Sequence, residues 1–348
     1  MNEHADPKRR TFLKAGGATA ASLLAASVTP DVQAQTASKP AAPAMPTRNL
    51  GRTGYKTGIF SLGGQAALER PNSEAAAVPI IDRALDLGVN YIDTSSIYGG
   101  KDRWSERYVG QVMKRRRTEA FLASKTKERT RDGSLRMLEE SLKLLNTDHL
   151  DLWQLHDIGE AEDVNAVFAN GGAMEALLQA REQKLVRYLG ITGHFRPEAL
   201  IDSMRRFRFD TILLAVNAAD KYHYSFLDQL LPLAVEQQLG IIGMKVPGRG
   251  RLLASWTPPP LERQQRSWEG AVIATTPGPL SMTEAMSYSL SLPVSTVIVG
   301  CDSISQLEEN VQIARAFTPL SERQMSAIAT RVEPVSKQAL FFRFVARG

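Results

Sequence analysis

The chain has 348 residues, a formal net charge of +5, and 43% hydrophobic residues. It is long enough to bury its own core, and its charge is mild with no long basic run, so nucleic acid binding is not indicated. Its single cysteine, Cys301, excludes an internal disulfide and a cysteine-cluster metal site. We expect Cys301 to be a small, partly buried side chain rather than a reactive thiol.

The first 34 residues are expected to be absent from the mature protein. Residues 8–14 contain an arginine pair, residues 15–27 are weakly apolar, and small residues precede the end of the segment at Ala34. This order resembles a bacterial twin-arginine (Tat) export signal, cleaved after Ala34. A disordered basic tail and an uncleaved anchor are the alternatives. The apolar stretch is shorter than the about 20 residues that span a bilayer, and no later segment is apolar enough. We therefore predict a soluble periplasmic protein, with the Tat machinery as its export partner.

Residues 35–46 are rich in Ala and Pro and are typical of a linker. Loss of residues 1–34 removes one net positive charge and leaves the mature chain near +4. We predict a globular barrel over residues 47–318 and a C-terminal tail over residues 319–348.

Eight short apolar runs alternate with segments of helical length, which predicts a repeated strand-helix unit. Their number and spacing predict a single α/β domain, a (β/α)8 or TIM barrel, whose usual size is about 250 residues. A doubly wound open sheet is the alternative, but no glycine-rich phosphate fingerprint opens its first strand-helix turn. The predicted strands are residues 60–62, 89–92, 120–124, 150–155, 188–191, 211–216, 241–244 and 296–299. Examples of the predicted helices are residues 76–87, 135–145, 174–184 and 306–316.

Three of the strands end in different ionisable residues, and a tyrosine follows the first of them. These residues are Asp93, Lys125 and His156, with Tyr98 five positions after Asp93. In a barrel, the carboxyl ends of the strands open into one shared mouth. We therefore expect these four side chains to meet, although the sequence separates them widely.

Together, the four residues could protonate an oxygen on which negative charge develops. A tyrosine, with an unperturbed pKa of about 10, gives its proton more easily beside an ammonium, which Lys125 could supply. Asp93 would hold that ammonium, and His156 would orient the substrate oxygen. Reduction of a carbonyl also needs a hydride, which no side chain donates, so a nicotinamide cofactor is implied.

The chain resembles the aldo-keto reductases from Arg48 to about Phe317. Its most specific match is the segment from Tyr91 to Gly99, followed by a Ser-Glu pair at residues 105–106. Ser124-Lys125 and residues 154–156, Gln-Leu-His, supply the rest of that family's Asp-Tyr-Lys-His set. The opening Leu-Gly-Arg-Thr-Gly at residues 50–54 is similar to the family's N-terminal β-hairpin. The resemblance implies NAD(P)H-dependent reduction of an aldehyde or ketone to an alcohol, without a metal.

The expected nicotinamide contacts depart from the family pattern. After the fifth strand, Thr192 and His194 stand where Ser-Asn is frequent, and after the sixth, Asn217 stands where Gln is common. After the seventh strand, Met244 replaces a stacking aromatic, and Lys245 follows it as a candidate pyrophosphate contact. We predict that these five residues bind the cofactor.

The adenosine contacts are expected after the eighth strand. Gly300 ends this strand, Gln306 replaces a common arginine, and Asp302 would repel a phosphate. Glu309 and Asn310 fit the family's adenine contact. We therefore predict either weak preference for NADPH or acceptance of NADH, and keep NADP(H) and NAD(H) as candidate cofactors.

Residues 248–280 form a long insertion after the seventh strand, and such insertions at a barrel mouth often act as lids. Its Arg251, or Arg249, is a candidate phosphate contact, although a purely surface role is equally open. Trp104 is a candidate substrate contact. The aromatic and basic residues 341–344 could pack across the barrel or on a partner subunit.

Two other functions stay open alongside the reductase. An exported enzyme lacks a free nicotinamide pool, although Tat export of a folded protein could carry a bound cofactor. The chain could therefore be a cofactor-binding sensor or interaction module, or a redox-relay subunit that exchanges electrons with a redox partner. The substrate and the oligomeric state cannot be read from the sequence.

Overall fold

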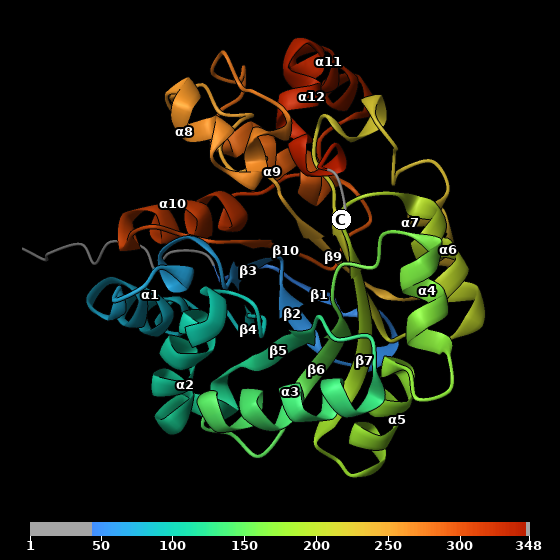
Figure 1. The fold of residues 1–348 in the computed structure, drawn as a ribbon. Helices are drawn as coiled ribbons and strands as arrows, with labels where there is room; N and C mark the ends of the chain where they lie inside the picture. Colours follow the sequence, from blue (N-terminus) through green and yellow to red (C-terminus); the bar gives the residue numbers. More distant parts are fainter. Residues whose placement is uncertain (1–43, 346–348) are drawn as a thin grey trace, which may run out of the picture. The chain divides into compact units, whose positions relative to one another are not determined.

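Eight parallel strands form a closed barrel in the order β10-β3-β4-β5-β6-β7-β8-β9 (Figure 1). This computed structural model describes residues 44–345, apart from the side chains of residues 268 and 269. The predicted export signal, residues 1–34, and most of the predicted linker lie outside the described residues. The predicted barrel is confirmed, and each of the eight apolar runs contributes a strand. The strands are β3 (Phe60–Gly63), β4 (Tyr91–Asp93), β5 (Phe121–Thr126), β6 (Leu150–Leu155), β7 (Val186–Gly193), β8 (Thr211–Ala215), β9 (Gly240–Met244) and β10 (Thr296–Val299).

Helices surround the strands of the barrel (Figure 1). The four helical segments predicted above all form. Four helices lie outside the simple strand-helix alternation: α4 precedes α5 after β6, α8 lies in the insertion after β9, and α11 and α12 follow α10 in the tail. The helices are α1 (Glu74–Asp86), α2 (Trp104–Arg116), α3 (Arg131–Leu144), α4 (Ala161–Phe168), α5 (Ala173–Glu182), α6 (Pro197–Arg206), α7 (Leu230–Glu236), α8 (Leu261–Gln265), α9 (Met282–Ser291), α10 (Ile304–Arg315), α11 (Glu322–Val332) and α12 (Ser336–Ala339).

The barrel strands are buried on both faces, as expected for a parallel sheet covered by helices. Every residue of β5 and of β6 is buried. The interior is tightly filled at Gly190, where an added Cβ would lie 2.4 Å from Thr211 Oγ1. A side chain at this position would push neighbouring strands apart, so close packing fixes the register of β7.

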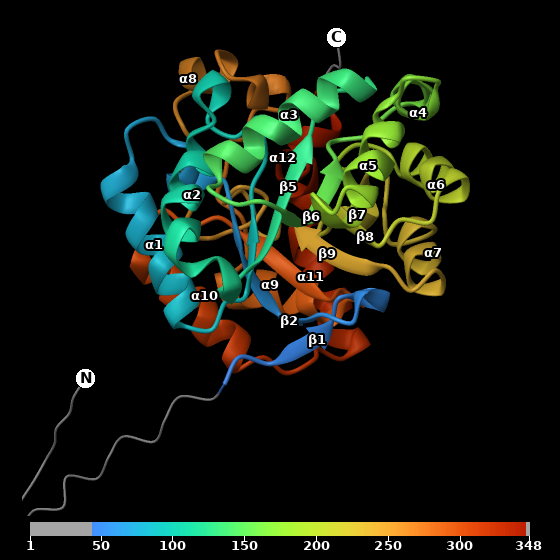
Figure 2. The ribbon, with the colours of Figure 1, turned by 90° about the horizontal axis from the view of Figure 1, so that it is seen from below.

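The predicted N-terminal hairpin is confirmed and lies at the amino ends of the barrel strands. Strands β1 (Thr47–Asn49) and β2 (Lys56–Gly58) pair antiparallel. The Arg48 guanidinium donates to Val294 O at 2.6 Å, just before β10. Figure 2 shows the hairpin below the barrel, away from α8. The opposite, carboxyl end of the barrel is therefore left open for a site.

The C-terminal tail packs across that carboxyl end. The buried guanidinium of Arg343 pairs with the buried carboxylate of Asp220 and donates to Ala215 O, the last residue of β8, at 3.0 Å. Tyr222 Oη donates to Ala329 O of α11 at 2.9 Å. The tail thus packs on the barrel of its own chain. Among residues 44–345, no helix combines the length and apolarity that crossing a membrane requires.

Candidate active site

The structure brings the four predicted catalytic residues together at the carboxyl end of the barrel. Asp93 ends β4, Lys125 lies near the end of β5, His156 directly follows β6, and Tyr98 lies in the loop after β4. Lys125 Nζ is 5.0 Å from the centroid of the Tyr98 ring. The Tyr98 and His156 rings meet edge to face, with centroids 5.8 Å apart. Side chains from three strand ends therefore line one site.

Asp93 and Lys125 form a buried ion pair. Lys125 Nζ lies 2.5 Å from Asp93 Oδ2 and donates to Thr94 O at 2.7 Å. Both side chains are at most 1% exposed. Burial raises the pKa of Asp93 and lowers the pKa of Lys125, and in each case the charge of the partner opposes the shift. The pair is thus mutually dependent, because either charge alone would be costly at this depth.

Tyr98 holds its proton firmly in the cofactor-free protein. Burial is the main reason that its pKa lies well above the usual value, and the charges of Asp93 and Glu69 raise it further. Arg249 lowers the pKa of Tyr98. We expected the ammonium of Lys125 to lower the pKa of Tyr98. This effect does not dominate, because the carboxylate of Asp93, 2.5 Å from Lys125 Nζ, neutralises the charge of the ammonium. Tyr98 is therefore a protonated phenol at neutral pH.

His156 is a neutral imidazole held by Ser95. Burial and then the charge of Lys125 lower the pKa of His156 well below its usual value. Its Nδ1 lies 2.9 Å from Ser95 Oγ. When Ser95 donates to Nδ1, Nε2 carries the hydrogen and can donate to a substrate oxygen. Sequence reasoning missed Ser95, although it lies within the segment that joins Asp93 to Tyr98.

Two of the predicted nicotinamide contacts, Thr192 and His194, share one neighbour, Asp157. The backbone N–H of Asp157 donates to Thr192 Oγ1 at 2.8 Å, and His194 Nδ1 lies 3.0 Å from Asp157 Oδ1. Lys127 Nζ pairs with Asp157 Oδ2 at 2.9 Å. Sequence reasoning also missed Asp157, whose position directly after His156 was the available signal. Thr192 and His194 are thus oriented by a common neighbour.

The contacts predicted after β8, β9 and β10 lie around a second polar group, Gln65. Asn217 Nδ2 donates to Lys245 O at 2.9 Å, and Lys245 Nζ donates to Gln65 Oε1 at 2.8 Å. A Cβ at Gly300 would lie 3.0 Å from Gln65 O, so this backbone approach is close. Met244 is 4% exposed at the end of β9. The structure places these residues at the barrel mouth, and their cofactor contacts stay predictions.

The predicted adenosine contacts lie on the first turns of α10. Gln306 Oε1 accepts from the backbone N–H of Asp302 at 2.8 Å, so this side chain closes the loop before the helix. Asn310 Nδ2 donates to Cys301 Sγ at 3.5 Å, and Glu309 is exposed. Burial raises the pKa of the Cys301 thiol to about 12, which fits the expected unreactive side chain.

Arg251 and Trp104 are engaged with neighbouring segments of the protein. Arg251 is 2% exposed, donates to Gln338 O at 3.2 Å, and lies 4.0 Å over the Phe341 ring. It thereby ties the insertion to the tail. Trp104 stacks on Tyr108 with ring centroids 5.7 Å apart. As phosphate and substrate contacts, these two residues stay predictions.

The donor set of this site can move a proton but supplies no hydride. It contains a protonated phenol, a neutral imidazole and a compensated ammonium, which fit a carbonyl oxygen that gains negative charge. Within residues 44–345, no group of three or more His, Cys, Asp or Glu side chains is placed to hold a metal ion. Because no side chain donates a hydride, these proton donors fit a reaction in which a bound nicotinamide supplies it.

Comparisons with known proteins agree with this chemistry. The family model for the Aldo/keto reductase family matches residues 57–333. The chain is 28% identical over 320 residues to the uncharacterized oxidoreductase YqkF of Bacillus subtilis, covering 83% of this chain and 97% of that protein. It is 28% identical over 316 residues to L-galactose dehydrogenase of Arabidopsis thaliana, covering 83% and 94%. The holo form of aldo-keto reductase AKR11C1 from Bacillus halodurans superposes with a TM-score of 0.66 at 25% identity, covering 82% of this chain and 96% of that chain.

Proposed function

Because the chain belongs to the aldo/keto reductase family, we propose that Tyr98 is the general acid of its reaction. The protein is an NAD(P)H-dependent oxidoreductase that reduces an aldehyde or ketone to an alcohol. The observation that carries the proposal is the position of the Tyr98 ring between the Lys125 ammonium, 5.0 Å away, and the His156 ring, 5.8 Å away. No other protonated phenol is held beside both groups within the described residues.

Each residue of the site has a separate task. His156 Nε2 donates a hydrogen bond to the substrate oxygen and orients the carbonyl toward the Tyr98 hydroxyl. Tyr98 Oη then gives its proton to that oxygen as negative charge develops on it. Lys125, held by Asp93, limits the rise in energy when the phenolate forms. Burial of all four groups excludes water and strengthens these interactions.

The bound nicotinamide would supply the hydride that the side chains lack. Thr192 and His194, both linked to Asp157, would hold its carboxamide group, and Met244 would pack on its ring. Asn217 and Lys245 would line the path of the pyrophosphate, next to Gly300. Gln306, Glu309 and Asn310 would meet the adenosine, and Arg70 lies beside them, paired with Asp302 at 2.6 Å.

Replacement of Tyr98 by Phe tests this assignment. The variant should lose roughly 100- to 10,000-fold in kcat, the usual range for a general acid, while cofactor Kd stays unchanged. Tyr224→Phe is the matched control, because Tyr224 is 41% exposed and lies outside the site. Retention of most of the activity by Tyr98→Phe would reject Tyr98 as the acid. A chain that serves as a sensor or a redox relay would be indifferent to the change.

The substrate class can be narrowed by a panel of carbonyl compounds. L-galactose dehydrogenase and D-threo-aldose 1-dehydrogenase are relatives named for sugar substrates. We propose that aldoses be compared with an aromatic aldehyde of similar size, in both directions of the reaction. Higher kcat/KM for the aldoses would support a polyhydroxylated substrate, whereas preference for the aromatic aldehyde would refute it.

We also propose that the enzyme is exported to the periplasm by the Tat machinery. The support is the arginine pair at residues 9 and 10, followed by a weakly apolar stretch and small residues before Ala34. The proposed boundaries are a signal over 1–34, a linker over 35–46, the barrel over 47–318 and the tail over 319–348. Fractionation of cells that express the chain should find a shortened protein in the periplasm. Replacement of Arg9 and Arg10 by Lys should keep it in the cytoplasm, and equal export of both forms would contradict the proposal.

A further inference from the structure

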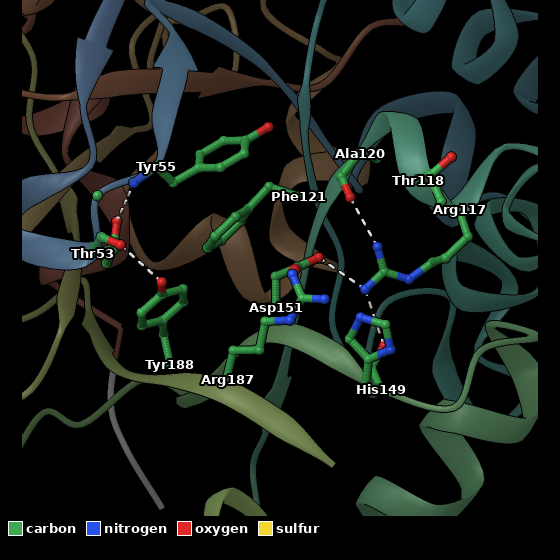
Figure 3. Close-up of a pocket in the computed structure, with 11 residues that line it drawn as sticks. Thr53, Tyr55, Arg117, Thr118, Ala120, Phe121, His149, Asp151, Arg187 and Tyr188 are labelled. Carbon is green, nitrogen blue, oxygen red and sulfur yellow. Dashed lines mark hydrogen bonds and ion pairs between the residues drawn. The ribbon is translucent and has the colours of Figure 1, made fainter. Parts of the chain in front are cut away.

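A cavity opens at the amino ends of the barrel strands, whereas the candidate active site lies at their carboxyl ends. Figure 3 shows the residues that line this cavity. Its volume is about 470 Å³, within the range of roughly 300–1,000 Å³ typical of small-molecule sites. It is lined by the hairpin loop and by the beginnings of β5, β6 and β7. Phe121 begins β5 and Lys125 lies four residues later, so about 13 Å of strand separates the cavity from the catalytic lysine.

One wall of the cavity is aromatic. The Phe121 ring lies 4.6 Å from Tyr55 and 6.0 Å from Tyr188, measured between ring centroids. Tyr55 Oη donates to Asn90 O and Tyr188 Oη donates to Thr53 O, both at 2.8 Å. Because their hydroxyls are already bonded, the two tyrosines hold their rings in place and offer apolar surface to a ligand.

The other wall carries two arginines that share one carboxylate. Asp151 Oδ1 pairs with Arg187 Nη1 and Asp151 Oδ2 pairs with Arg117 Nη2, both at 2.8 Å. The Asp151 side chain is only 4% exposed, and it also accepts from Leu122 N at 2.9 Å. In Figure 3 the three rings lie to the left of Asp151, and Arg117 and His149 lie to its right. Two guanidinium groups around one carboxylate leave one net positive charge.

Of the two guanidinium groups, that of Arg187 is open to a ligand. Every guanidinium nitrogen of Arg117 already donates, to Thr147, Ala120 and His149 as well as to Asp151. The Arg187 side chain is 60% exposed, and only its Nη1 has a hydrogen-bond partner among the described residues. Its remaining donors can bind one carboxylate, which is the planar anion that a guanidinium fork matches.

We propose that this cavity is a second binding site, which takes a small organic molecule with a planar apolar body and one carboxylate. The apolar body packs on the half-buried rings of Tyr55 and Tyr188, which lie against the buried Phe121 ring, and the carboxylate binds the open side of Arg187. A cationic ligand is disfavoured because the Asp151 carboxylate already accepts from three donors and the net charge of the two arginines and Asp151 is positive. The site is separate from the reaction, so its ligand does not compete with the carbonyl substrate.

Calorimetric titration of the cofactor-free protein with 2-naphthoate tests the proposal. We expect saturable binding that weakens about tenfold or more in Arg187→Gln, the change expected on loss of a charge-assisted hydrogen bond. Arg205→Gln is the matched control, because Arg205 is an exposed arginine on α6 outside the cavity. Arg187→Lys, which keeps the charge without the fork, should bind with intermediate affinity. Tyr98→Phe should bind 2-naphthoate as the unmodified protein does, because its change lies in the active site.

Four outcomes would overturn the proposal. The first is the absence of binding at millimolar 2-naphthoate. The second is equal binding of the neutral 2-naphthamide, which would remove the role of Arg187. The third is equal binding of inorganic phosphate, which would replace the ligand class. The fourth is loss of binding in Tyr98→Phe with no effect of Arg187→Gln, which would assign the probe to the active site.

Discussion

Replacement of Lys125 by Met should destabilise the protein strongly, because it leaves the carboxylate of Asp93 buried without its counter-ion. Asp93 and Lys125 are 1% and 0% exposed and lie 2.5 Å apart. Removal of one partner from a buried ion pair costs about 3–5 kcal/mol. Asp93 Oδ1 lacks a hydrogen-bond partner in the described structure. Gln154 and Lys245 also lower the pKa of Asp93, but each has a smaller effect than Lys125, so they replace the ammonium only in part. Urea unfolding followed by tryptophan fluorescence would measure the loss in the free energy of unfolding.

The loss should shrink as the pH falls. Burial raises the pKa of Asp93 in the folded protein, and without Lys125 nothing of comparable strength opposes that shift. When the pKa of an acid is higher in the folded than in the unfolded protein, its ionisation destabilises the fold. The loss in the free energy of unfolding is greatest at a pH above the pKa in the folded protein. It decreases as the pH falls through the folded pKa and disappears below the unfolded value of about 4. Lys125→Met should therefore regain stability relative to the unmodified protein between about pH 8 and pH 5.

Lys127→Met is the matched control for this experiment. Lys127 lies two residues after Lys125 and also forms an ion pair, with Asp157. The side chains of Lys127 and Asp157 are 41% and 24% exposed. An exposed pair of this kind contributes about 0–1 kcal/mol. If Lys125→Met were no less stable than Lys127→Met, or if its loss were the same at both pH values, the charge-burial argument would be refuted. Addition of Asp93→Asn to Lys125→Met should recover part of the loss, because the double variant buries no unpaired charge.

Three further predictions concern the reaction itself. Ser95→Ala should lower kcat roughly three- to tenfold by releasing the ring of His156, with unchanged cofactor Kd and rescue by Ser95→Thr. A normal kcat in Ser95→Ala would show that this bond does not position the ring. Gln306→Arg should lower the Kd for NADPH about tenfold or more and leave the Kd for NADH unchanged. A hundredfold preference for NADPH in the unmodified protein would contradict the predicted weak preference for this cofactor. The kcat of carbonyl reduction should be constant from about pH 6 to pH 9, because the pKa of Tyr98 is raised and that of His156 is lowered. A basic limb in the kcat profile near neutrality would exclude Tyr98 as the titrating acid.

The sequence predicted the barrel and its catalytic end because both depend on local patterns. Apolar runs of strand length mark their own ends, and the fold directs all carboxyl ends to one mouth. Asp93, Lys125 and His156 could therefore be placed without any knowledge of distant contacts.

The remaining contacts depend on segments that approach one another only in the folded chain. Arg251, a predicted phosphate contact, also packs against Phe341 from a tail 90 residues later in the chain, a contact that the sequence did not indicate. Gln306 was expected at the adenosine, and its amide oxygen also caps the turn at Asp302. The cavity beside Asp151 combines four segments, and no pattern within any one of them indicates that they meet. Such loop-to-loop contacts follow from tertiary packing, which neither periodicity nor spacing encodes.

The raised pKa of Tyr98 is compatible with its role as an acid. An unperturbed phenol, with a pKa of about 10, is a far stronger acid than water, whose pKa is about 15.7. Burial raises the pKa of Tyr98, so proton transfer to the oxygen of a reduced carbonyl depends on that oxygen becoming the stronger base once the hydride has been added. Lys125 contributes mainly once the phenolate forms, because before that Asp93 compensates its charge at 2.5 Å. The ion pair thus stabilises the Tyr98 phenolate, the charged state that the reaction creates. Because the buried Tyr98 stays protonated at neutral pH, the acid is present at the start of each turnover.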